Sequence, residues 1–174
     1  MTAYIMNCLF DSIQIPATLD CGLGAIDNSD VYIVNSTFGN NIQQNTDIGG
    51  TVSLMGKANV FAYNSIFYNN SPRQFAQKDY ENTPTHLEIY NSLVEGGEDG
   101  IYVATPEHIL HYDSTNIDAD PLWANTGYYP YMLSYGSPCI NTGTLDLPEH
   151  IELPRNRPCG QSPRLRWANR HGRL

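Results

Sequence analysis

A short phrase recurs four times in the first hundred residues, at almost constant intervals. Each copy alternates apolar with other residues, reaches an Asn, and then continues with Cys or Ser and two further residues that are mostly apolar. The copies occupy residues 4–10, 32–38, 61–67 and 87–94, and their Asn residues are Asn7, Asn35, Asn64 and Asn91. The intervals of 28, 29 and 27 residues are typical of a solenoid, in which each unit buries its apolar face against its neighbours.

The repeated phrase predicts a strand. Its alternation, its β-branched and aromatic residues, and the Gly, Asn, Asp and Pro around it all favour a strand over a helix. A strand that returns to the same place every 27 to 29 residues forms a parallel β coil. We therefore expect an all-β solenoid of about four to six coils, with coils over residues 2–113 and an irregular closing segment up to residue 148. Prolines at positions 121, 130, 138 and 148 suit such a segment, because Pro is excluded from central strands.

The four Asn residues are predicted to form a structural ladder. At a strand spacing of about 4.8 Å, identical side chains lie over one another and their amides can hydrogen-bond along the stack. Asn also tolerates the left-handed backbone conformation, so it can turn the chain between two sheets. The residues two positions later are then stacked as well, and Thr37 is the polar exception among Leu9, Ile66 and Leu93.

These phrases resemble right-handed parallel β-helix repeat proteins, which implies a single-stranded, right-handed parallel β-helix. Residues 116–123, 131–133 and 136–143 also resemble the closing segment of bacterial surface proteins of the choice-of-anchor group. That segment has an Asp-Pro-Leu-Phe phrase, a Tyr-x-Leu strand and a Ser-Pro-Ala-Ile-Asp-x-Gly turn. This chain departs from it at Trp123, Cys139 and Asn141. The resemblance covers most of residues 4–143 and implies an extracellular or cell-surface protein. It says little about activity, because such helices carry several enzyme classes as well as binding surfaces.

The last 20 residues differ sharply in charge from the rest. Residues 155–174 hold six basic and no acidic side chains, whereas residues 1–154 hold three basic and 18 acidic ones, a formal charge of −15. One interpretation is a basic tail that pairs with the acidic body or binds a polyanion. We favour a change of reading frame after Pro154. A shift of one nucleotide, with permitted codons, reads Glu-Ile-Asp-Leu-Ala-Gly-Asn-Pro-Arg and later Ile-Asp-Met-Gly-Ala-Tyr, which resembles the ending of the same group. Residues 149–174 are thus expected to be non-native or disordered.

The charge and the apolar content of the chain limit the classes of partner that it can bind. The acidic body disfavours nucleic acid, because phosphate contacts need a basic surface. No apolar run reaches the roughly 18 residues of a membrane span. The start of the chain lacks the basic region of a signal peptide, so we expect a C-terminal piece of a longer secreted or cell-surface precursor. Its uncapped first coil is then open to edge-to-edge self-association.

Candidate chemistry is sparse. Glu95, Glu98 and Asp99 follow the fourth repeat in a Gly-rich loop, and glycoside hydrolysis requires paired carboxylates, although acids in an exposed turn are usually only solvated. Asp118 and Asp120 offer hard oxygens to calcium, and this ion is the only cofactor that the sequence suggests. Alternating Asp residues in a turn more often cap backbone amides, however.

Two function classes remain. The first is a non-catalytic module that binds neutral glycans or partner proteins through Tyr63 and Tyr90, because aromatic rings stack on sugar faces. The alternative is a polysaccharide-active enzyme, a glycoside hydrolase or lyase, whose active site lies partly or wholly in N-terminal coils missing from this chain. A lyase acting on polyuronates fits less well, because Lys57, Arg73 and Lys78 are the only basic residues of a body with charge −15.

Overall fold

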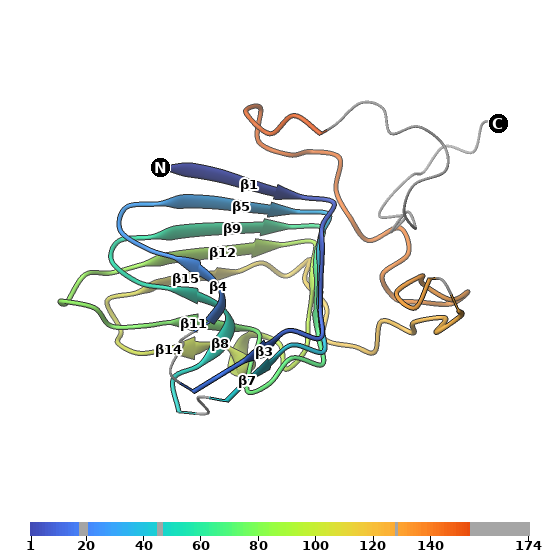
Figure 1. Ribbon diagram of the computed structural model, residues 1–174. Coiled ribbons are helices and arrows are strands. Elements are labelled where there is room, and N and C mark those ends of the chain that lie inside the picture. The colour runs from blue at the N-terminus through green and yellow to red at the C-terminus, as the bar shows by residue number, and fades with distance from the viewer. Residues whose placement is uncertain (18–20, 45–46, 128, 154–174) are drawn as a thin grey trace.

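Strands from successive coils pair side by side in parallel sheets that enclose a common interior (Figure 1). The computed structural model describes residues 1–17, 21–44, 47–127 and 129–153. Sheet A, the largest, has the strand order β1 (Thr2–Met6), β5 (Asp30–Val34), β9 (Asn59–Tyr63), β12 (His86–Tyr90) and β15 (Ile109–Tyr112). Within it, Met6 pairs with Val34, Val34 with Tyr63, and Tyr63 with Tyr90.

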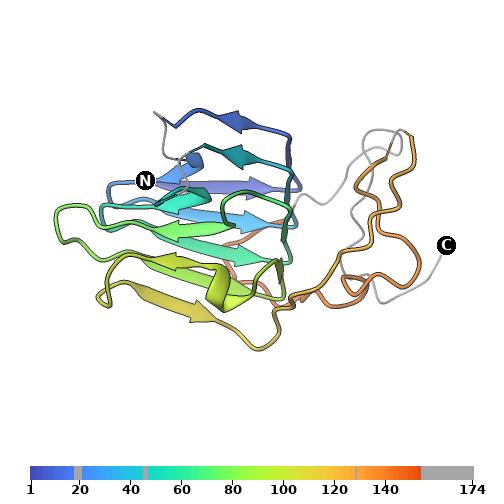
Figure 2. The same ribbon diagram turned by 90° about the horizontal axis from the view of Figure 1, so that it is seen from below.

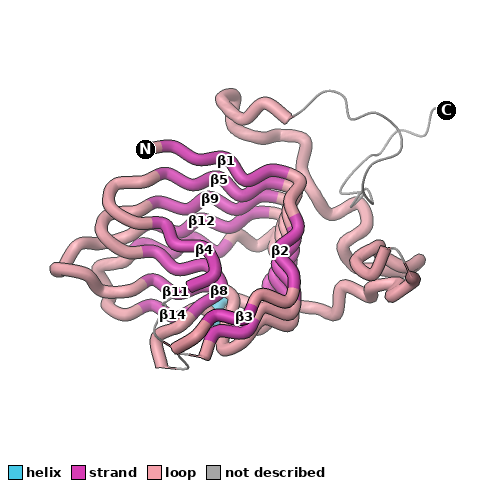
Figure 3. Tube along the Cα trace, in the orientation of Figure 1, coloured by secondary structure: helices cyan, strands magenta, loops and turns pink. Residues whose placement is uncertain are grey.

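Two further sheets complete each coil. Sheet B contains β2 (Leu9–Asp11), β6 (Thr37–Gly39), β10 (Ile66–Tyr68) and β13 (Leu93–Val94). Sheet C contains β4 (Cys21–Ala25), β8 (Gly50–Leu54), β11 (Phe75–Gln77) and β14 (Tyr102–Val103). The short strands β3 (Gln14–Ile15) and β7 (Ile42–Gln43) pair between sheets B and C. Figures 2 and 3 show the stacked coils, so the predicted all-β parallel solenoid is confirmed.

Helix is nearly absent from the described residues. They contain one short 3-10 helix, η1 (Glu98–Gly100), between β13 and β14. Within these residues, no helix has the length and apolarity to cross a membrane.

The four repeated Asn residues turn the chain from sheet A into sheet B. Their φ angles lie between 48° and 53°, in the left-handed region that Asn tolerates better than most residues. The backbone N–H of Asn7 donates to the carbonyl of Val34 at 3.0 Å, and that of Asn35 donates to the carbonyl of Tyr63 at 3.1 Å. The turn therefore continues the parallel ladder from one coil to the next.

The serines that follow Asn35, Asn64 and Asn91 form a hydrogen-bonded ladder inside the turn. Ser65 Oγ accepts the backbone N–H of Ser36 at 3.1 Å and donates to the carbonyl of Tyr63 at 2.9 Å. Ser92 Oγ accepts the N–H of Ser65 in the same way, at 3.1 Å. Asn116 Oδ1 takes the equivalent place in the next coil and accepts the N–H of Ser92 at 3.0 Å. Each buried amide thus finds its acceptor in the following coil, as buried backbone groups require.

The interior is filled by stacked apolar side chains. Phe10, Phe38 and Phe67 stack with ring centroids 4.4 Å and 5.0 Å apart, close to the strand spacing. Alternate residues of sheet A, such as Ile33 and Ile89, pack against this stack and are fully buried.

The segment after β15 folds back over the outside of the solenoid. On the outer face of sheet B, Trp123 and Leu133 pack against Ile66, Leu93 and the buried Cys139. The hydroxyl of Tyr131 hydrogen-bonds Asp11 of the first coil and accepts from Asn40 Nδ2 of the second at 2.6 Å. Residue 39 must be small here, because a Cβ on Gly39 would lie 2.8 Å from the Tyr131 ring. The closing segment therefore joins the last coil to the first two.

Two of the four repeated Asn amides hold this closing segment. Asn64 Nδ2 donates to the carbonyl of Thr144 at 2.8 Å, and Asn64 Oδ1 accepts the N–H of Thr144 at 2.8 Å. Asn91 Nδ2 donates to the carbonyl of Thr142 at 3.1 Å. The predicted basic tail begins at residue 149, and its residues 154–174 lie outside the described part of the chain.

Candidate ligand-binding face

Aromatic side chains line the outer face of sheet A. Because side chains alternate along a strand, the pattern that sends Val60 and Ala62 inward sends Phe61 and Tyr63 outward. Tyr32 and Phe61 stack at 4.9 Å between ring centroids. Tyr63 and Tyr90 stack at 5.2 Å with only 8° between their ring planes.

Residues 144–153 cover the part of this face that lies over the earlier coils. His150 packs edge-on against Tyr32 at 4.7 Å, and Ile151 joins Val34 and Tyr63 in a buried cluster. Tyr63 is consequently only 9% exposed, whereas Tyr90 is half-buried. The outward residues of β12 and β15 remain accessible. We call them the open strip: His86, Glu88, Tyr90, Ile109 and His111.

A groove of about 480 Å³ lies where the covering segment meets the tyrosine pair. Tyr63 and Tyr90, the two ligand-binding residues predicted from the sequence, lie together in its wall. The other lining residues come from the turn after β12 and from the covering segment: Asn91, Thr144, Asp146, Leu147, Pro148 and Glu149. The groove therefore combines flat apolar rings with amide and carboxylate oxygens.

The open strip carries an ordered polar network. Tyr90 donates its hydroxyl hydrogen to Glu88 Oε2 at 2.8 Å, and His86 Nε2 lies 2.9 Å from Glu88 Oε1. Burial, followed by the hydrogen bond to Glu88, raises the pKa of Tyr90 to about 12, so its phenol stays protonated at neutral pH. His111 packs beside the Tyr90 ring at 5.2 Å between centroids. Sequence analysis missed Glu88 and His86, although strand alternation places residues 86, 88 and 90 on one face.

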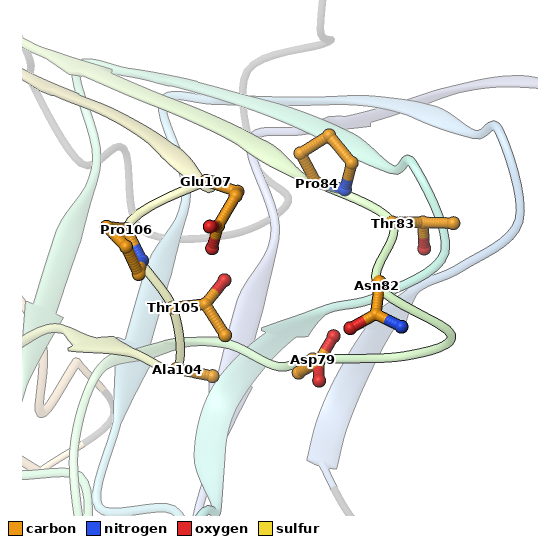
Figure 4. Close-up of a pocket in the computed structure, with 8 residues that line it drawn as sticks. All are labelled: Asp79, Asn82, Thr83, Pro84, Ala104, Thr105, Pro106 and Glu107. Atoms are coloured by element: carbon orange, nitrogen blue, oxygen red, sulfur yellow. The ribbon is translucent and has the colours of Figure 1, made fainter.

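A second hollow, a cleft of about 400 Å³, lies beyond the opposite end of β12 (Figure 4). It separates the loop that enters β12 from the loop that enters β15. Asp79, Asn82, Thr83 and Pro84 line one side of it, and Ala104, Thr105, Pro106 and Glu107 line the other. Each loop thus contributes one carboxylate, from Asp79 and from Glu107.

The buried His108 supports both loops of the cleft. Its Nδ1 accepts the backbone N–H of Thr85 at 3.0 Å, which ties residue 85, next to the cleft, to the loop before β15. Burial lowers the pKa of His108, so the ring is neutral at pH 7. Its Nε2 is buried and has no hydrogen-bond partner among the residues that the structure describes.

The three candidate catalytic acids lie elsewhere, in and before η1. Glu95 Oε2 accepts the backbone N–H of Asn69 at 2.7 Å and the side-chain N–H of Gln74 at 3.2 Å, so this carboxylate links successive coils. Glu98 and Asp99 are exposed in η1. None of the three lines the groove or the cleft.

The two candidate calcium ligands each accept a backbone hydrogen bond. Asp118 Oδ1 accepts the N–H of Gly96 at 3.0 Å, and Asp120 Oδ1 accepts the N–H of Leu122 at 2.7 Å. In the described part of the chain, no three His, Cys, Asp or Glu side chains form a group suited to a metal ion.

Comparisons of the chain with known protein families, curated proteins and solved structures found no match. Inferences about function therefore rest on the groove, the open strip and the cleft themselves.

Proposed function

We propose that this chain is a non-catalytic β-solenoid module that binds a neutral glycan in the groove beside Tyr63 and Tyr90. The observation that carries the proposal is the stacked tyrosine pair in the wall of a groove that also contains amide and carboxylate oxygens. Sugar rings present an apolar face to aromatic rings and hydroxyl groups to hydrogen-bond acceptors.

The segment that covers part of the groove is also tethered to the solenoid. Asn64 and Asn91 fix the covering segment through its backbone at Thr142 and Thr144, and Ile151 anchors that segment beside Tyr63. A site built on paired strands and a tethered segment loses little conformational freedom on binding, which favours affinity.

The experiment is isothermal titration calorimetry of the purified chain with neutral oligosaccharides, such as cellohexaose. Tyr90→Ala should weaken binding about two- to tenfold, because it removes the ring–sugar contact. Tyr135→Ala is the matched control, since Tyr135 is fully exposed in the closing segment and lies outside the groove. Absence of binding to every neutral oligosaccharide, or an equal loss in both variants, contradicts the proposal.

The alternative function is hydrolysis of a polysaccharide. Asp146 and Glu149 both line the groove, and glycoside hydrolysis uses two carboxyl groups on either side of the scissile bond. Release of reducing sugar by the purified chain, abolished in Asp146→Asn or Glu149→Gln, would favour this function over binding alone. An active site in coils that precede this chain would instead require the longer protein for activity.

We further propose that the protein is a secreted or cell-surface protein of the choice-of-anchor group, whose reading frame changes after Pro154. The phrases at residues 116–123 and 136–143, together with six basic and no acidic residues after position 154, support this origin. The nucleotide sequence around the codon for Arg155 tests it directly. Among the described residues, β1 is the edge strand of its sheet, and such an edge suits association with another surface protein or a second copy, which sedimentation analysis would detect.

A further inference from the structure

We infer that this face prefers glycans with protonated amino groups to uncharged ones, because the carboxylates of the groove, the open strip and the cleft can each bind an amino group along the sugar chain. The inference rests on the proposed glycan binding and extends it from neutral sugars to their amino derivatives.

The groove and the cleft are joined by one strand. Strand β12 begins at His86, two residues after Pro84 of the cleft, and ends at Tyr90 of the groove. Five residues of strand span about 13 Å between the first and last Cα atoms, at about 3.3 Å per residue. On the neighbouring strand β15, Ile109 pairs with His86 and His111 pairs with Glu88. The open strip is therefore two strands wide. An extended chain that lies along β12 therefore contacts both hollows.

Carboxylates occur in every part of this path. Asp146 and Glu149 line the groove, Glu88 lies at the centre of the strip, and Asp79 and Glu107 line the cleft. No Lys or Arg is among the described residues that line the two hollows or form the strip. The body around them carries a formal charge of −15. Such a field attracts cations and repels polyanions, so a ligand with positive groups at intervals matches the face better than an uncharged one.

Glu88 is held in place to receive such a group. Its two oxygens already have one polar neighbour each, the Tyr90 hydroxyl at 2.8 Å and His86 Nε2 at 2.9 Å. A carboxylate has about four lone-pair sites, so both oxygens keep acceptor capacity for a ligand N–H. An ammonium group supplies three donors, and its hydrogen bonds to a carboxylate are charge-assisted and shorter than neutral ones. Tyr90 also lies in the groove wall. A sugar ring that contacts Tyr90 therefore places its amino group next to Glu88.

The test compares two hexasaccharides that share a β-1,4-linked backbone, cellohexaose and fully deacetylated glucosamine hexamer. Calorimetry with the full chain at low ionic strength should show the glucosamine hexamer binding at least about tenfold more tightly. This ratio should shrink strongly at 1 M salt, where the screening length falls to about 3 Å. Glu88→Gln and Glu107→Gln, which keep side-chain shape, should each reduce the ratio about two- to fivefold, as expected for partly exposed ion pairs.

Asp99→Asn is the control variant, because Asp99 is an exposed acid in η1, between sheets B and C and away from this face. Its ratio of affinities for the glucosamine hexamer and cellohexaose should equal that of the unaltered chain. Thermal melting of every variant should verify that it folds. Equal affinity for both hexamers overturns this inference and leaves the proposed function standing. Binding of neither hexamer overturns both. An equal loss in Asp99→Asn and Glu88→Gln would show diffuse attraction to an acidic protein, which also overturns the inference.

Discussion

Phe67→Ala should be among the most damaging single substitutions in this chain. Phe67 has no exposed surface and lies between Phe38, whose ring centroid is 5.0 Å away, and Phe75, at 4.5 Å. These neighbours belong to strands that are hydrogen-bonded on both sides, so they cannot move into the cavity that the lost ring leaves. Truncation of a buried Phe in such a setting costs about 3–5 kcal/mol. This is a large part of the roughly 5–15 kcal/mol that stabilises a typical domain.

The assay is reversible urea and thermal unfolding, followed by far-UV circular dichroism. For a domain of this size, the melting temperature should fall by about 6–20 °C. Phe10→Ala provides the internal control, because Phe10 belongs to the first coil, is only half-buried and stacks on a single neighbour, Phe38. Since a solenoid is stabilised by contacts between neighbouring coils, Phe10→Ala should cost about half as much. Equal costs in the two variants, or a Phe67→Ala cost below about 1 kcal/mol, would refute the view that the stacked phenylalanines form the core.

Three further outcomes are expected. Ser65→Ala removes the acceptor for the buried N–H of Ser36 and should cost about 1–3 kcal/mol in urea unfolding, and an unchanged midpoint would show that the serine ladder is dispensable. Ile66→Asp places a carboxylate under the closing segment beside Leu93 and Cys139, and should unfold the chain at neutral pH; a melting temperature equal to that of the unaltered chain would contradict this. Burial raises the pKa values of Tyr63, Tyr90 and Tyr112 to about 12, above the ordinary value of 10.0. Because folding favours the neutral phenols, their contribution to stability is complete below pH 10 and is lost as the pH rises towards 12. Spectrophotometric titration of tyrosinate, with circular dichroism in parallel, should show these three groups ionising late and together with unfolding; ionisation near pH 10 in the folded chain would refute the burial argument.

The coil period and the identity of the strand could be predicted because both depend on local chemistry. Alternating apolar residues specify which side of a strand is buried, and the Asn residues suit a backbone with φ near 50° at the turn. Parallel strands of successive coils lie at one constant spacing. Residues separated by the repeat interval in the sequence therefore lie over one another along the solenoid axis. The stacking of Phe10, Phe38 and Phe67 follows from the interval alone.

The distribution of hydrogen bonds within the turn could not be predicted. Asn and Ser recur together in the second, third and fourth copies, and either side chain can cap a neighbouring coil. The structure uses serine oxygens for the buried amides, and it uses the amides of Asn64 and Asn91 to hold the closing segment. The choice depends on the position of residues 142 and 144, which no local pattern specifies.

The repeat alone is enough to specify the parallel solenoid, because its constant interval states which residues become neighbours in successive coils. The repeat does not distinguish Tyr63 from Tyr90, since each precedes the Asn of its phrase. The difference between them arises from tertiary contacts: Ile151 buries Tyr63, whereas Tyr90 stays half-buried, lines the groove and donates a hydrogen bond to Glu88. The closing segment has no repeat, so its contacts form between residues far apart in the chain, such as Tyr131 with Asp11. Such contacts follow from the shape and polarity of the finished outer faces, and these exist only once the coils have stacked.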